Sequence, residues 1–265
     1  MLASRECMAD PLLLAIDIGN TSVAVGVYDG EDLVATFRIA TDQDNLPDEY
    51  AILLLSLLRT RDIEPSRVGA AALSSTVPPL ITTFMQVCRD YFRVEPLIIG
   101  TGVRTGIRVR YDNPREVGAD RILHVVAALA KYKPPLIILD MGTALVLDAV
   151  SREGDYLGGS IAPGIGISSQ ALFARAAMLR RVSIERPESV IGKNTVNSVQ
   201  SGLYFGYVEM VMGMIRRFKA EIGEDATVIA TGGYAQLLMP DLESVDSFEP
   251  NLNLDGLRRV WEANR

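Results

Sequence analysis

The sequence predicts a mixed α/β protein built from two related lobes, and three observations support this prediction. Short apolar runs rich in β-branched residues alternate with longer amphipathic stretches, which favours strands followed by helices. One pattern of strand, turn and hairpin occurs twice, with Asp17 and Asp140 at equivalent places almost half the chain apart. Glycine residues bound both apolar runs, which is typical of buried strands.

The first copy runs from Leu12 through the turn Asp17-Ile18-Gly19-Asn20-Thr21 into strands expected over 22–28 and 33–40. The second copy has Asp140-Met141-Gly142-Thr143-Ala144, followed by strands expected over 145–150 and 156–162. The steps Asp29-Gly30 and Glu153-Gly154 indicate hairpins, the first more strongly than the second. Matching hairpins favour a duplicated unit over chance similarity between two turns.

The rest of the chain predicts helices after each three-stranded copy. Further strands are expected over 68–73 and 227–230, and helices over 47–58, 77–91, 118–132, 164–179, 195–221 and 254–262. A doubled α/β unit implies two lobes with a cleft between them. We place the lobes at residues 12–117 and 118–265, and leave open that the C-terminal helix packs back on the first lobe.

Composition excludes several classes of protein. The net charge of −7 argues against a nucleic-acid partner, which would require a basic field. Cys7 and Cys88 are the two cysteines, and without a CxxC pair they indicate neither a disulfide framework nor a zinc site. No apolar run reaches membrane-spanning length, and residues 1–10 lack the apolar stretch of a signal peptide. We therefore expect no membrane partner and a cytoplasmic location.

The repeated turns have the chemistry of a phosphate site. Gly19 lets the main chain approach a ligand closely, and successive N–H groups form an anion-binding concavity. A carboxylate at the mouth repels phosphate unless a cation lies between them, so Asp17 suggests phosphate together with Mg²⁺. The alternative is a plain strand-end turn in which Asp17 is a local cap. The second copy at Asp140, and Thr231-Gly232-Gly233 after a further strand, favour ligand binding.

Taken together, these turns resemble the nucleotide contacts of the actin-like, sugar-kinase-like ATPase superfamily. That resemblance implies a fold of duplicated ribonuclease-H-like lobes that clamp a nucleotide in a cleft.

Four further motifs narrow the resemblance. They are Tyr111-Asp112-Asn113-Pro114, Gly118-Ala119-Asp120-Arg121, the segment Gly158–Gly164, and Ile191-Gly192-Lys193-Asn194-Thr195. In this order they resemble the type III pantothenate kinase family, from Leu13 to the C-terminus. The resemblance implies transfer of the ATP γ-phosphate to pantothenate, giving 4'-phosphopantothenate as the first step of coenzyme A synthesis. It also implies a homodimer that needs ATP, Mg²⁺ and a monovalent cation, K⁺ or NH₄⁺.

The resemblance assigns a role to individual residues. Asp120 is the expected base for the pantothenate hydroxyl, although an acid at a helix start also has a purely structural reading. Arg121 suits the pantothenate carboxylate or a phosphate, and a helix salt bridge is its alternative. Asp140 matches the K⁺ ligand. The other expected substrate contacts are Tyr111, Gly118, Ala119 and Thr195. The alternative for Thr195 is plain helix capping by Asn194 or Thr195, and both roles are compatible. The expected ATP contacts are Asp17, Ile18, Gly19, Asn20, Thr21, Ser22, Val23, Ala24 and Thr143.

The sequence departs from the family pattern at three places. Val146 stands where members usually have Thr, Arg180 follows Leu179 where they have Pro, and 42–47 lacks a common Arg-Thr-Ala run. A catalytically weak paralogue that senses a ligand or regulates another protein therefore remains an alternative. A sugar kinase of the same superfamily is a second one, disfavoured because the Cys-rich zinc motif of some such kinases is absent. We expect helix 195–221 to contribute to the dimer interface through a broad apolar surface made of Val199, Leu203, Phe205, Val208, Val211 and Ile215.

Overall fold

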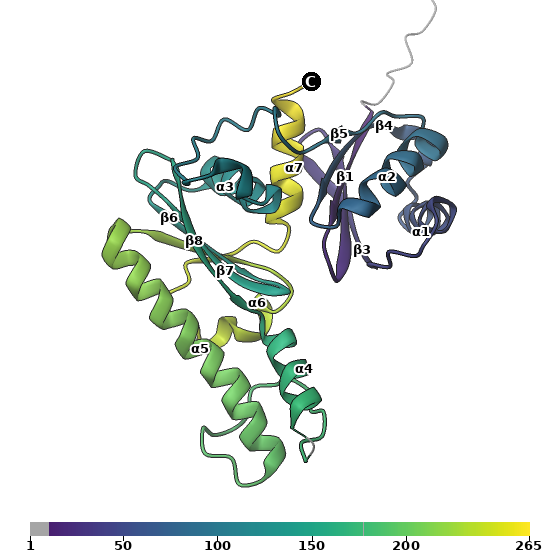
Figure 1. The fold of residues 1–265 in the computed structure, drawn as a ribbon. Helices are drawn as coiled ribbons and strands as arrows, with labels where there is room; N and C mark the ends of the chain where they lie inside the picture. The colour runs from purple at the N-terminus through teal and green to yellow at the C-terminus, as the bar shows by residue number, and fades with distance from the viewer. Residues whose placement is uncertain (1–10, 177) are drawn as a thin grey trace, which may run out of the picture. The chain divides into compact units, whose positions relative to one another are not determined.

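The computed structural model describes residues 11–176 and 178–265, so residues 1–10, expected to lack a signal peptide, lie outside the described residues. The chain divides into two compact units (Figure 1). The first unit contains the chain up to Thr105 together with 118–123 and 253–265, and the second contains 106–117 and 124–252. Helix α3 therefore contributes to both units, and the lobe boundary expected between 117 and 118 stays a prediction.

The first unit contains a five-stranded sheet in the order β3-β2-β1-β4-β5. Strands β1 and β2 are antiparallel, as are β2 and β3, whereas β4 pairs parallel with both β1 and β5. The strands are β1 (Leu12–Ile18), β2 (Ser22–Asp29), β3 (Asp32–Ala40), β4 (Val68–Ser75) and β5 (Leu97–Ile98). Helices α1 (Pro47–Arg59), α2 (Pro78–Val87) and α7 (Leu252–Glu262) accompany them.

The second unit repeats this plan, with strands in the order β8-β7-β6-β9-β10. Strands β6 and β7 are antiparallel, as are β7 and β8, whereas β9 pairs parallel with both β6 and β10. The strands are β6 (Leu136–Met141), β7 (Ala144–Val150), β8 (Tyr156–Pro163), β9 (Thr227–Thr231) and β10 (Ser247–Phe248). The helices are α4 (Ile165–Arg175), α5 (Thr195–Ile222) and α6 (Ala235–Leu238), and α3 spans Ala119–Lys131.

Identical strand order and strand direction confirm the duplicated α/β unit. In each sheet the strand that ends in the Asp-containing turn occupies the centre, with its hairpin partner on one side and a parallel strand on the other. The two aspartates consequently occupy the same register position. Asp17 pairs with Ala24 and Ser74, and Asp140 pairs with Val146 and Thr231.

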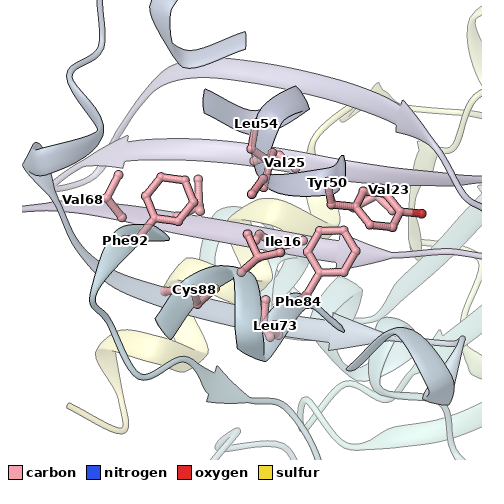
Figure 2. Packing of buried hydrophobic residues seen from close by; sticks show 14 of the residues in the cluster. Ile16, Val23, Val25, Tyr50, Leu54, Val68, Leu73, Phe84, Cys88 and Phe92 are labelled. Carbon is pink, nitrogen blue, oxygen red and sulfur yellow. The ribbon is translucent and has the colours of Figure 1, made fainter. Parts of the chain in front are cut away.

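Along the two central strands, alternate side chains point to opposite faces of the sheet, so the apolar core residues and the aspartates lie on different faces. In β1, Leu14, Ile16 and Ile18 belong to the apolar core under α1 and α2, where the rings of Tyr50 and Phe84 lie 4.6 Å apart (Figure 2). Because successive side chains of a strand point to opposite faces, Asp17 projects from the other face. In β6, Ile137 and Leu139 likewise enter the second core and Asp140 does not.

Most expected elements occur in the structure, with differences at helix ends. The helix expected over 77–91 is α2 followed by one π-helical turn at Cys88–Phe92, and α4 ends at Arg175 instead of 179. The two-residue strands β5 and β10 and the one-turn helix α6 were missed, because such short segments have no periodic pattern. Among the described residues, no helix has both the length and the apolar character needed to cross a membrane.

Candidate functional site

The first glycine turn is held by hydrogen bonds to its main-chain groups within the first unit. Gly19 N donates to Ser22 O (3.1 Å), and the Thr41 hydroxyl donates to Gly19 O (2.6 Å). Thr76 N, after β4, donates to Ile18 O (2.9 Å). A Cβ at position 19 would lie only 3.0 Å from Ser22 O, so glycine is favoured sterically. The turn is therefore fixed on both sides of β1 before any ligand binds.

The expected ATP segment divides into exposed and buried positions. Asn20 and Thr21 are exposed at the tip of the turn, and Gly19, Ser22 and Ala24 are half-buried. The side chains of Ile18 and Val23 are fully buried in the first core. Those two residues can therefore offer only main-chain groups to a nucleotide, whereas the tip can offer backbone, amide and hydroxyl groups.

Asp17 is tied to the C-terminal helix. Asn253, in the first turn of α7, donates from Nδ2 to Asp17 Oδ2 over 2.6 Å. The two residues are separated by 236 positions in sequence. Sequence reasoning missed Asn253, because no local motif signals a contact over that separation.

The start of α3 places the expected base against a glycine. A Cβ on Gly118 would collide with Asp120 Oδ1, so the carboxylate folds back over the Gly118 main chain. Asp120 is half-buried and Arg121 is buried, with 8% of its surface exposed. Asp120 and Arg121 belong to the first unit, as does the Asp17 turn.

The second glycine turn forms a cradle around Asp140 within the second unit. Gly142 N donates to Ala144 O (3.0 Å), and Gly164 N donates to Thr143 O (3.0 Å). Gly232 adopts φ +94°, and a Cβ there would collide with Asp140 Oδ1. The conformation and the space both require glycine. The Thr231-Gly232-Gly233 motif thus meets the Asp140 turn, as expected for a ligand-binding edge, and Thr143 is exposed there.

Tyr111 packs on a glycine of β8. Gly158 adopts φ +120°, and a Cβ there would lie 3.2 Å from the Tyr111 ring. The Tyr156 ring lies 6.3 Å from that of Tyr111, and its hydroxyl donates to the buried Asp148 (2.9 Å). The Tyr156 ring and the Gly158 main chain therefore orient Tyr111. The Gly158-Gly159 sequence did not indicate this packing.

Thr195 lines a pocket at the beginning of α5. Asn194 caps this helix, with its side-chain oxygen accepting from Asn197 N (2.9 Å). The capping role proposed for Asn194 or Thr195 therefore falls to Asn194, while Thr195 is exposed. The pocket measures about 740 Å³ and also touches α4 and the segment after it; its lining includes Leu172, Leu179, Lys193, Ser198 and Val199.

The expected site residues thus lie in two groups. Asp17 to Ala24 and Gly118 to Arg121 belong to the first unit, and Tyr111, Asp140, Thr143 and Thr195 belong to the second. Each group combines one glycine-rich turn with candidate substrate contacts; the first group has two candidate carboxylates, Asp17 and Asp120, and the second has one, Asp140.

Comparisons with known proteins agree on one family. The family model described as type III pantothenate kinase matches residues 13–217. The type III pantothenate kinase of Geobacter sulfurreducens is 48% identical over 96% of this chain and 100% of its own length. That of Roseiflexus sp. (strain RS-1) is 47% identical with the same coverages.

Similarity to solved structures extends to more distant proteins and concerns the fold alone. Component A of (R)-2-hydroxyglutaryl-CoA dehydratase from Acidaminococcus fermentans has a TM-score of 0.55 at 14% identity, covering 96% of this chain and 100% of that one. An archaeal actin homolog has a TM-score of 0.53 at 11% identity, covering 95% and 99%. These likenesses confirm the expected actin-like, ribonuclease-H-like plan of the sheets.

Proposed function

The chain belongs to the type III pantothenate kinase family, and on this premise we propose which of its residues perform each part of the reaction. It is an ATP-dependent kinase that phosphorylates pantothenate, the opening step of coenzyme A synthesis. The family match over nearly the whole chain is the observation on which this function depends. The geometry of the two glycine turns supports the assignment of roles.

Nucleotide phosphates are assigned to the Asp17 turn and to Thr143. Phosphoryl transfer requires mainly positioning and charge stabilisation from the protein. Among residues 11–176 and 178–265, no three His, Cys, Asp or Glu side chains converge on a metal position. Mg²⁺ still suits the Asp17 turn, because this ion keeps several of its waters and binds a protein through one or two carboxylates together with substrate phosphates. Asp17 would hold the ion, which supplies charge neutralisation on the phosphates.

Asp140 is assigned to a monovalent cation, K⁺ or NH₄⁺. Without a cation, its carboxylate would repel a nearby polyphosphate by about 1–4 kcal/mol for charges ~4 Å apart. Because Gly142 and Gly232 have no side chains, the main chain comes close to the Asp140 carboxylate, where carboxylate and main-chain oxygens would hold the ion together. A cation bound between the Asp140 carboxylate and the phosphates turns this repulsion into a net attraction.

Asp120 is assigned as the base for the pantothenate hydroxyl. Its half-buried carboxylate is held at the helix start against Gly118, where it can accept a proton. Arg121 offers a rigid set of donors for the pantothenate carboxylate or a phosphate. Gly118 and Ala119 line the pantothenate site with main chain, and Tyr111 and Thr195 provide the remaining substrate contacts.

We also propose a cytoplasmic homodimer, with the beginning of α5 at its interface. Four apolar residues of α5 that suggested a dimer, Leu203, Val208, Val211 and Ile215, are buried in the core of their own unit. Exposed apolar side chains lie instead at the helix start and just before it, where Val196 is 47% exposed and Ile191 is 80% exposed. This surface adjoins Thr195, so association there would affect the substrate pocket.

An ADP-release assay with and without pantothenate tests the function directly. We expect ADP release to require pantothenate and to depend on K⁺ when Na⁺ is the comparison. Binding of both ligands without turnover would indicate a ligand-sensing paralogue instead. Turnover with a sugar but not with pantothenate would indicate a different kinase.

A further inference from the structure

We propose that Asn253, in the first turn of α7, is a positioning residue that fixes the Asp17 carboxylate for nucleotide binding. The inference rests on the role proposed above for Asp17. Asn253 Nδ2 donates to Asp17 Oδ2 over 2.6 Å. A carboxylate can only accept, so the amide must turn its NH₂ group toward Asp17. The interaction therefore defines the orientation of both side chains.

Asn253 stands on a firmly anchored helix. The Arg258 side chain is almost completely buried and pairs with Asp255 (3.1 Å) and Glu262 (2.7 Å). Its guanidinium lies 5.6 Å from the centre of the Tyr28 ring on β2. Leu254 of α7 reaches Gly26 of the same strand, where a Cβ would lie 3.1 Å from the leucine. A polar group on such a rigid element can hold its partner precisely.

The same helix also touches the segment that bears Asp120. A Cβ on Gly256 would collide with the Leu123 main chain, so α7 and α3 approach each other closely at this point. Asp120 lies in the first turn of α3, one turn before Leu123. One face of α7 thus supports both proposed site carboxylates of the first unit, Asp17 by a hydrogen bond and Asp120 through helix packing.

Two buried polar atoms near this contact have no hydrogen-bond partner among the described residues. Ser74 pairs with Asp17 in register on β4, yet its buried hydroxyl makes no hydrogen bond within the described part of the chain. The Asn253 Oδ1 atom is likewise buried without a partner among the described residues. An unsatisfied buried acceptor lowers stability, so replacing Asn253 with leucine removes that cost along with the donor. We expect this replacement to change function more than folding.

The test is a double-mutant cycle with Asp17→Ala and Asn253→Leu, read by calorimetric titration with a non-hydrolysable ATP analogue in the presence of Mg²⁺. Loss of a partner that orients a metal- or phosphate-binding carboxylate commonly weakens affinity by about 10- to 100-fold. We expect Asn253→Leu to weaken the affinity by at least ~10-fold at that scale. The double variant should bind no more weakly than Asp17→Ala alone, because both changes remove one interaction.

Steady-state kinetics and stability provide the accompanying readouts. Asn253→Leu should raise KM for MgATP while KM for pantothenate stays unchanged, and its Tm should remain close to that of the wild type. The matched control is Ser74→Ala, which alters another side chain beside Asp17 and should leave the affinity for the analogue unchanged.

The possible failures are distinguishable. Normal affinity in Asn253→Leu alongside weak binding in Asp17→Ala would overturn the inference and leave the role of Asp17 intact. Normal affinity in Asp17→Ala would overturn that role and the inference with it. A large drop in Tm with equal losses for both substrates would show that Asn253 only supports the fold.

Discussion

Val146 lies directly opposite Asp140 in the antiparallel pairing of β7 with β6. Residues opposite each other in such a pair present their side chains on the same face, with Cβ atoms about 4.5–5.5 Å apart. Position 146 is also one of the places where the sequence departs from the expected family pattern, which has threonine there. The residue that departs from the expected pattern, Val146, is therefore the immediate cross-strand neighbour of the proposed cation ligand.

We expect Val146→Thr to lower the K⁺ concentration that gives half-maximal activity by about 3- to 10-fold, the scale of one added hydrogen-bonding group. Val146 is half-buried, so the new hydroxyl can reach solvent and the fold should tolerate it. The measurement is a K⁺ titration of the kinase rate. Val146→Ala, which adds no oxygen, serves as control, and an equal shift in that variant would contradict the explanation.

Asp140→Asn should lower activity and weaken its dependence on K⁺ together. The substitution keeps the shape of the side chain within its glycine cradle and removes the charge that attracts the cation. The rate should be measured against K⁺ at constant ionic strength, with choline as the balancing salt. Full wild-type activity without K⁺, or an unchanged K⁺ response in the variant, would reduce Asp140 to a structural carboxylate.

Asp120→Asn should reduce kcat by about 10²- to 10⁴-fold, the usual contribution of a general base. Asparagine is nearly isosteric, so the packing on Gly118 and the stability should persist. Single-turnover measurements isolate the chemical step from product release. Asp90→Asn, which neutralises an exposed carboxylate of the same unit, should retain normal rates. Chemistry within a few-fold of wild type in Asp120→Asn would exclude Asp120 as the base.

Ile191→Lys should convert a dimer to a monomer and weaken pantothenate binding. Ile191 is 80% exposed beside Thr195, and a charge there would have to be desolvated in an apolar interface. Light scattering at micromolar concentration gives the mass of both proteins. Leu46→Lys, at a residue 63% exposed on the first unit, is the matched control and should leave the mass unchanged. A monomeric wild type would contradict the proposed assembly.

The ion pair between Arg186 and Asp241 should make the stability of the second unit pH-dependent. Hydrogen bonds from Arg186 and then from Tyr204 lower the pKa of Asp241 from 3.8 to about 2. A carboxylate whose pKa is lower in the folded than in the unfolded protein stabilises the fold at pH values above its unfolded-state pKa. This stabilisation disappears as the pH falls through its folded-state pKa. The Tm difference between wild type and Arg186→Gln should therefore be full at neutral pH and vanish between about pH 4 and pH 2.

Arg152→Gln provides the comparison for that experiment. Arg152 also binds a carboxylate through two nitrogen atoms, with Asp225, but both side chains are about 60% exposed. Solvent screens such pairs strongly, so the Tm change should be smaller at every pH. A Tm difference for Arg186→Gln that stays constant down to pH 2 would contradict the assignment.

Many of the strands, hairpins and turns of this protein could be predicted from its sequence, because they depend on local chemistry. The alternation of apolar residues, the hairpin steps and the Asp-Gly turns each involve residues within a few positions of one another. Such patterns specify strands and tight turns directly, so the two copies around Asp17 and Asp140 could be recognised and aligned. The order of the motifs then indicated the family, and with it the expected base at Asp120.

Tertiary structure alone decided which distant groups support those motifs. Asn253 reaches Asp17 only because α7 packs on β2, and Gly232 meets Asp140 only because β9 pairs with β6. The amphipathic pattern of α5 revealed an apolar face but not whether its own sheet or a second chain covers it. Packing and register between segments far apart in sequence settle these contacts, and no local pattern encodes them.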